Sequence, residues 1–239
     1  MDNTEDFRSV FNQIEDHLRK ITDSEANVGF ARLVDLASVQ DGLVRTFERD
    51  LKQFGDLRNA IVHAVDGRFL ANPSEKSVEK LRYIYKLLTR PPTAFDIATQ
   101  PVETCDLNSS ILEVVQKMVS KDFTNIPVLS SGQFVGVFSE SSVVRWLGDS
   151  GEKGGFILDR TKIDELRKYF DSPEGKFGSY KFTARSVSAY DIRNEFLALT
   201  VQKKRLGAVF VTEHGDKKEK ILGIITAWDL PRIEKLVED

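Results

Sequence analysis

Thr226 and Asp229 stand three residues apart, directly after an apolar, β-branched run that predicts a strand. A hydroxyl at a strand-to-helix turn, together with the free backbone N–H groups of the helix start, can hold a phosphate. A carboxylate at position 229 can accept hydrogen bonds from both hydroxyls of a ribose. Thr and Asp are also common helix caps. The pattern therefore indicates either an anchor for a sugar phosphate or a cap.

A second group with chemical potential is Arg58, Asn59 and His63. Histidine titrates near neutral pH and suits acid–base work, and arginine binds two phosphate oxygens with its planar fork. Asn59 lies one helical turn from His63 and could orient the imidazole. Arg58 lies about 140° from His63 around a regular helix, so a shared site needs an irregular chain or a second subunit. The alternative is structural, with Arg58 paired to Asp56 or Asp35.

Two stretches, residues 123–144 and 206–230, repeat one pattern of strand, turn, strand and helix start. Each follows an amphipathic helix, and each turn holds a glycine where a hairpin needs a positive φ. Such a duplication predicts one fold unit used as a pair, with a ligand between equivalent halves. The expected elements are helix 109–120, strands 125–129 and 133–138 and helix 140–147, then helix 189–202, strands 208–212 and 220–225 and helix 228–237.

The second copy reads Gly-Ile-Ile-Thr-Ala-Trp-Asp from Gly223, and the first opens its hairpin with Ile126-Pro127-Val128. This arrangement resembles the CBS domain, named after cystathionine β-synthase, which works in tandem pairs. The resemblance covers residues 95–239 and implies a regulatory adenine nucleotide: AMP, ADP, ATP, S-adenosylmethionine or a cyclic adenine dinucleotide. It also implies that a ligand anchored at Thr226 and Asp229 touches the other copy, at Val102, Glu103, Thr124, Asn125, Ile126 and Pro127.

The first copy departs from this pattern. Ser139 keeps the hydroxyl, but Ser142 stands where the ribose aspartate belongs, and a serine cannot accept two charge-assisted hydrogen bonds. In the second copy Phe210 replaces the proline. We expect one competent site and one impaired or empty site, the latter at Ser139, Ser142, Gly207 and Ala208. The basic run 203–205 is either a solvated face or a contact for ligand phosphates.

The run Leu57 to His63, in a helical region of about 90 residues, resembles the HEPN family. Many members of that family are metal-independent endoribonucleases that cleave RNA through its own 2′-hydroxyl, and some build composite sites across a dimer. The resemblance implies Arg58, Asn59 and His63 as catalytic residues. Other members are non-catalytic interaction or RNA-binding modules, so both interpretations stay open.

Apolar residues at helical spacing predict three helices before residue 90: one over 7–21, a long one over 33–54, and a third near Asn72. We expect Asn72 to cap the third helix and Pro73 to occupy its first position. Pro91-Pro92 ends the helical region. The predicted domains are a helical domain 1–90, a first CBS unit 95–147, an insertion with one helix 148–180, and a second CBS unit 181–239.

These elements predict an α+β protein, with an N-terminal all-α bundle followed by a tandem pair of α/β units. The net charge of −3 supplies no global basic field for nucleic acid. The single cysteine excludes an internal disulfide and a multi-cysteine zinc site, and three scattered histidines predict no metal. With no apparent signal peptide and no apolar run near 20 residues, we expect a cytoplasmic protein without membrane contact.

The combined expectation is a sensor of adenine nucleotides whose ligand regulates the helical domain, which could be an endoribonuclease acting on RNA. The alternative is a non-enzymatic nucleotide-binding regulatory or dimerisation protein. Both resemblances point to a homodimer, and neither requires a cofactor.

Overall fold

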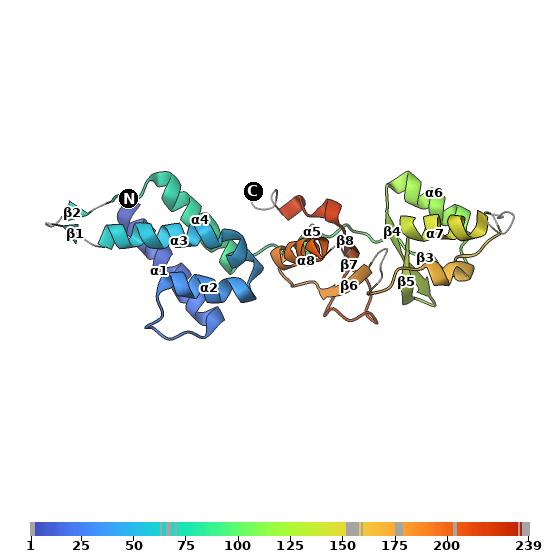
Figure 1. The fold of residues 1–239 in the computed structure, drawn as a ribbon, viewed down its shortest axis with the longest axis horizontal. Helices are drawn as coiled ribbons and strands as arrows, with labels where there is room; N and C mark the ends of the chain where they lie inside the picture. The colour runs from blue at the N-terminus through green and yellow to red at the C-terminus, as the bar shows by residue number, and fades with distance from the viewer. Residues whose placement is uncertain are drawn as a thin grey trace. The chain divides into compact units, whose positions relative to one another are not determined.

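The computed structural model describes residues 3–62, 64–65, 68–69, 71–151, 158, 160–174, 179–202, 205–233 and 235. The chain folds into two compact units, one built on Met1–Pro92 and the other on Thr93–Val187 and Ile192–Lys235. Helices alone build the core of the first unit, and the second contains two small mixed sheets. This confirms the predicted α+β class (Figure 1).

Four helices make the core of the first unit: α1 Asn3–Thr22, α2 Phe30–Gln40, α3 Gly42–Val62 and α4 Glu75–Thr89. A short antiparallel pair, β1 Ala64–Val65 and β2 Arg68–Phe69, lies between α3 and α4. The core is aromatic at its centre, where the rings of Phe11 and Phe30 lie 4.4 Å apart.

The single long helix predicted over 33–54 is wrong, because Asp41 divides it into α2 and α3. Asp41 leaves the helical region, and its carboxylate accepts the N–H groups of Leu43 and Val44 at 2.8 and 2.9 Å. Apolar periodicity continues across the break, so spacing alone could not reveal it. The predicted cap of α4 was also misplaced, since Ser74 rather than Asn72 accepts the N–H of Ser77.

The second unit contains two repeats with the same topology. In each sheet an outer strand pairs parallel with the first strand of an antiparallel hairpin: β3 Cys105–Asp106, β4 Asn125–Ser130 and β5 Gln133–Ser139, then β6 Ser179–Ala184, β7 Leu206–Thr212 and β8 Gly223–Ile225. The crossover helices are α6 Ile111–Lys121 and α8 Ala189–Val201. Strands β3 and β6, which pair parallel with β4 and β7, were not expected from the sequence.

Both hairpin glycines have the expected positive φ, 78° at Gly132 and 89° at Gly215. The helix predicted from Glu140 is α7 Glu140–Gly151. Two other boundaries differ from the expectation. Strand β8 begins at Gly223 rather than Lys220, and the chain after it enters the short 3-10 turn η2 Ala227–Asp229 before it becomes helical at Arg232.

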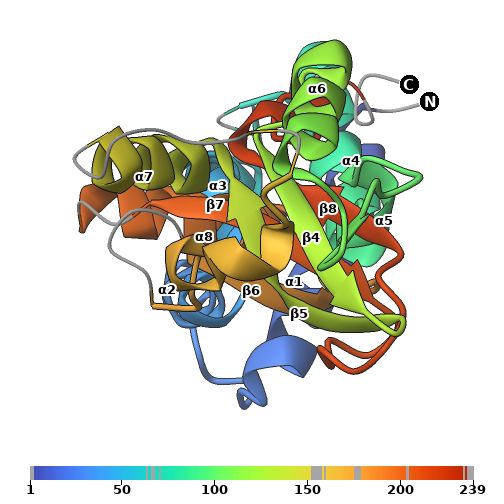
Figure 2. The same cartoon turned by 90° about the vertical axis from the view of Figure 1, so that its right-hand side faces the viewer.

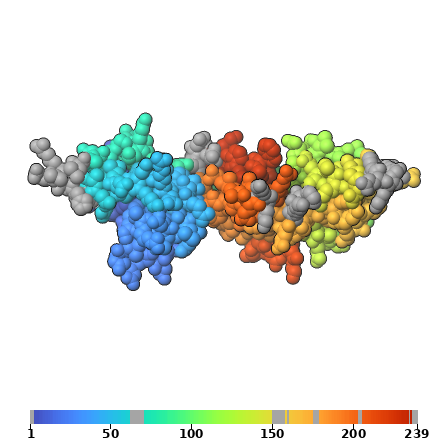
Figure 3. All heavy atoms as spheres, in the orientation of Figure 1, coloured from blue at the N-terminus to red at the C-terminus, as the bar shows by residue number. Residues whose placement is uncertain are grey.

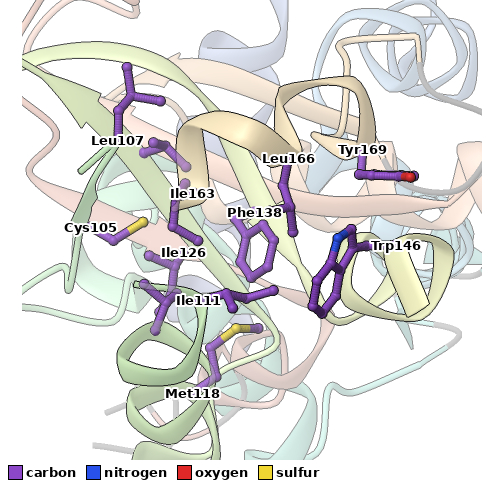
Figure 4. Packing of buried hydrophobic residues seen from close by; sticks show 12 residues of the cluster. Cys105, Leu107, Ile111, Met118, Ile126, Phe138, Trp146, Ile163, Leu166 and Tyr169 are labelled. Carbon is purple, nitrogen blue, oxygen red and sulfur yellow. The ribbon is translucent and has the colours of Figure 1, made fainter. Parts of the chain in front are cut away.

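The segment between the repeats contributes to the core of the first repeat. Its predicted helix is a 3-10 helix, η1 Ile163–Tyr169. Ile163 and Leu166 are fully buried and pack with Phe138 of β5 and Trp146 of α7 (Figure 4). Deleting η1 would therefore open the core of the first repeat.

The two sheets face each other through an aromatic cluster. Val137, Ala208 and Phe210 are buried there, and the rings of Phe134 and Phe182 meet edge-on at 4.9 Å. Figure 2 looks onto β4 and β5, with β7 and β8 of the second repeat behind them. This packing joins the two repeats into one body.

The short helix α5 Ala94–Ile97 precedes the first repeat but pairs with the second. Thr99 exchanges backbone hydrogen bonds with Ile224 of β8, at 2.8 and 3.2 Å. The approach is so close that a Cβ on Gly223 would lie 2.6 Å from the Cβ of Ala98. Glycine at position 223 is therefore a packing requirement.

We expect Gly223→Ala to lower the free energy of unfolding by about 1–3 kcal/mol, the usual cost of overpacking. Gly148→Ala is the matched control, because a Cβ there meets nothing within 4 Å in α7 and should stabilise the helix by about 0.5–1 kcal/mol. Urea unfolding followed by tryptophan fluorescence measures both, since Trp146 and Trp228 both lie in the second unit. Equal midpoints for Gly223→Ala and the parent would contradict the prediction.

Candidate functional site

A cavity of about 580 Å³ opens between the two repeats of the second unit. Figure 3 shows the first repeat in green and yellow against the second in orange and red. Six of the eight residues predicted to hold a nucleotide line this cavity: Val102, Glu103, Thr124, Asn125, Thr226 and Asp229. The tertiary structure thus brings together segments more than 100 positions apart.

Asp229 lies at the turn that follows β8, and its side chain is 8% exposed. Its carboxylate accepts the N–H and the hydroxyl of Thr226 at 2.8 and 2.9 Å. It also accepts the Thr99 hydroxyl at 2.8 Å and pairs with Arg232 at 3.2 Å. The cap that the sequence offered as one alternative is therefore formed, and a ribose diol would compete with the two hydroxyls for carboxylate lone pairs.

The opposite wall of the cavity comes from the first repeat. The Asn125 amide donates to the Thr124 hydroxyl at 2.8 Å and to the Gly207 carbonyl at 3.3 Å, which ties the wall to β7. Glu103 pairs with Lys121 and, at 3.3 Å, with Lys117. These two ammonium groups, Lys121 foremost, hold the pKa of Glu103 below its usual value.

Ile126 and Pro127 do not line the cavity. Both are buried, and Ile126 belongs to the core of the first repeat with no exposed surface. For Ile126 the reason is the two-residue period of β4, which turns its side chain away from Asn125 and into the core.

Trp228 and Thr99 are among the lining residues that were not predicted from the sequence. Trp228 is 83% exposed and lines the cavity from within the η2 turn, where its ring offers a flat apolar face. A large apolar residue inside a polar turn is a signal that could have been used. Thr99 offers no such signal, because only the pairing with β8 brings it to Asp229.

A second cavity of about 770 Å³ opens at the equivalent turn of the first repeat. Ser139 and Gly207, two of the four residues expected at the second site, line it. Ser142 is fully buried behind Ser139, and its hydroxyl accepts the Ser139 N–H at 3.1 Å. Ala208 is fully buried between the sheets and does not line the cavity.

In the helical unit, Arg58 and Asn59 line a separate cavity of about 590 Å³ with Arg32. The Arg58 guanidinium donates to the Asn59 amide oxygen at 3.4 Å. Asp35, one of the proposed acidic partners of Arg58, instead pairs with Lys52 at 2.6 Å. His63 lies outside the described residues.

Within the described ranges no three His, Cys, Asp or Glu side chains gather as metal ligands. The thiol of Cys105 is buried, and this burial raises its pKa to about 12, so it stays protonated and packs as an apolar group. None of the helices in the same ranges is long and apolar enough to cross a membrane.

Residues 94–149 match the family model of the CBS domain. No curated protein matched the chain. Among solved structures, the chain is similar to the CBS domain pair of protein MJ0100 in complex with 5′-methylthioadenosine and S-adenosyl-L-methionine (16% identity, 61% of this chain and 97% of that one, TM-score 0.43). It is also similar to CBSX2 in complex with AMP (18% identity, 62% and 98%, TM-score 0.43). A third is the CBS-domain containing protein ATU1752 from Agrobacterium tumefaciens (15% identity, 59% and 98%, TM-score 0.42). By sequence, residues 94–149 are thus similar to a CBS domain.

Proposed function

We propose that the second unit is a regulatory module that binds an adenine nucleotide in the first cavity. The observation that carries the proposal is the Asp229 carboxylate, which is nearly buried in the cavity lining beside the hydroxyls of Thr226 and Thr99. A ribose has two adjacent hydroxyls that can replace these donors. The volume of about 580 Å³ lies within the usual range for small-molecule sites.

Each part of such a ligand has a candidate partner in the lining. The ribose would bind Asp229, and a phosphate would lie near Arg232 and Lys121, whose side chains are about half exposed. The heterocycle would lie against the first-repeat wall at Thr124 and Asn125 or on the ring of Trp228.

The charge of the lining narrows the ligand class. Glu103, Asp122, Glu140 and Asp229 supply four carboxylates against the two cations Lys121 and Arg232. This excess of negative charge opposes each phosphate of a ligand and favours a ligand with one phosphate or none. Within the class of adenosine ligands, we propose AMP or S-adenosylmethionine ahead of ADP, ATP or a cyclic dinucleotide.

We expect AMP or S-adenosylmethionine to raise the melting temperature of the protein, because a ligand of the folded state stabilises it by mass action. At a ligand concentration 100 times the Kd, the free energy of unfolding rises by about 2.7 kcal/mol. At about 2–4 °C per kcal/mol, the melting temperature rises by several degrees. Asp229→Asn should reduce the rise, because the first cavity loses its carboxylate. Differential scanning fluorimetry with each nucleotide measures it.

Asp216→Ala is the matched control for this experiment, because Asp216 is an exposed turn aspartate of the same repeat and lines neither cavity. It should keep the full ligand-induced rise. For each variant, the melting temperature with ligand is compared with that of the same variant without ligand, since Asp229→Asn also weakens the cap on Thr226. An equal rise in Asp229→Asn, or none in the parent, would contradict the proposal.

A second candidate function, metal-independent RNA cleavage, rests on the cavity of the helical unit. Arg58 and Arg32 line it, and guanidinium groups suit RNA phosphates. Arg58 would stabilise charge on the scissile phosphate, with His63 as the acid–base group. A homodimer would then be required if the two residues act in one site from opposite faces of the helix.

We expect the protein to cleave single-stranded RNA in the presence of EDTA, and Arg58→Ala to slow cleavage by about 10²-fold or more, the usual effect of removing a group that stabilises developing charge. Arg8→Ala, a change at an exposed arginine of α1 that does not line this cavity, should cleave at the parent rate. Gel analysis of labelled RNA measures both. Absence of cleavage by the parent protein, with or without nucleotide, would leave the non-enzymatic regulatory role.

A further inference from the structure

The segment that precedes each repeat pairs with the last strand of the other repeat. The two pairings lie at equivalent positions. Thr99 donates its N–H to Ile224 of β8 at 2.8 Å, and Asp171 donates its N–H to Val137 of β5 at 2.9 Å. Ile224 and Val137 are themselves equivalent, since each stands two residues before the hydroxyl of its turn. Thr99 and Asp171 therefore occupy matching places beside the two turns.

At these matching places the hydroxyl and the carboxylate are interchanged between the two repeats. At the first cavity the hydroxyl comes from the leading segment, at Thr99, and the carboxylate comes from the turn, at Asp229. In the first repeat the turn carries the buried hydroxyl of Ser142 instead, and the leading segment supplies the carboxylate of Asp171, which lines the second cavity. Each turn thus has a buried carboxylate beside it, although only Asp229 lies in the repeated motif.

The surroundings of Asp171 match those of Asp229 in kind. Its side chain is 3% exposed, and it accepts the Ser141 hydroxyl at 3.3 Å and the Arg145 guanidinium at 3.0 Å. Arg145 stands six residues after Ser139, as Arg232 stands six after Thr226. Burial raises the pKa of Asp171, while hydrogen bonds from Ser139 and the charge of Arg145 oppose that shift.

The two cavities differ in charge at the rim. Arg205 lines the second cavity at the start of β7, at the place that Asp122 occupies before β4 in the first. The second cavity therefore carries two carboxylates, Asp171 and Glu140, and one guanidinium, where the first carries four carboxylates and two cations. Its lining opposes a phosphate less strongly.

We infer that Asp171 supplies the carboxylate that position 142 lacks, and that the second cavity binds a second ribonucleotide through its ribose diol, with the phosphate toward Arg205. This inference rests on the proposed function of the first cavity and extends it to two ligands per chain. It replaces the expectation of an impaired second site, because a carboxylate 29 positions further along the chain lines the same cavity.

Isothermal titration of the full chain with AMP tests the inference. The parent should bind two AMP molecules. Asp171→Asn should weaken one site by about 10- to 100-fold, the usual worth of a hydrogen bond to a charged group, and leave the site that needs Asp229 unchanged. 2′-Deoxy-AMP should bind the parent weakly at both sites, because each carboxylate loses one hydroxyl.

Two further variants separate binding from folding. Arg205→Ala changes an exposed side chain outside the core and should weaken only the second site. Ser142→Asp combined with Asp171→Asn returns the carboxylate to the turn and should restore AMP binding there along with the preference over 2′-deoxy-AMP. Recovery of that preference cannot come from a merely structural role of Asp171.

The outcomes distinguish this inference from the function on which it rests. One AMP per chain, lost in Asp229→Asn and unchanged in Asp171→Asn, would overturn the second site and leave the proposed function standing. An equal loss of AMP and 2′-deoxy-AMP in Asp171→Asn would assign Asp171 a structural role only and overturn the inference. No binding by the parent would overturn both.

Discussion

The second unit depends on the close pairing of a leading segment with the last strand of each repeat. Glycine permits this pairing twice, since a Cβ on Gly223 would lie 2.6 Å from Ala98 and one on Gly136 would lie 2.7 Å from the ring of Phe170. Each pairing places the next residue, Thr99 or Asp171, beside a turn. Without this approach neither cavity would have its full set of polar groups.

A buried carboxylate is stable only where donors surround it, because burial without partners costs several kcal/mol. Asp229 and Asp171 each accept a hydrogen bond from a hydroxyl, and each forms an ion pair with an arginine, Arg232 and Arg145 respectively. The donors must surround the carboxylate in space, whichever segment of the chain carries it. A duplicated fold can therefore lose the acid from one motif and regain it from a neighbouring segment.

Local signals predicted much of the fold correctly. Turn glycines with a need for positive φ located both hairpins, and apolar spacing located α6 and α8. The errors arose where a polar side chain acted over a short distance. Asp41 ends one helix and starts the next within an unbroken apolar pattern. The strands β3 and β6 were not predicted because β3 has only two residues and β6 has no regular alternation of buried and exposed residues.

The sequence by itself determined the duplicated unit, the hydroxyl and acid at Thr226 and Asp229, and the loss of the acid at Ser142. These follow from residue types at short spacing. Only the tertiary structure decided that Ile126 faces the core, that Thr99 reaches Asp229, and that Asp171 stands beside the turn of the first repeat. The physical reason is that such contacts join segments through strand pairing, and pairing partners are set by the packing of the whole unit.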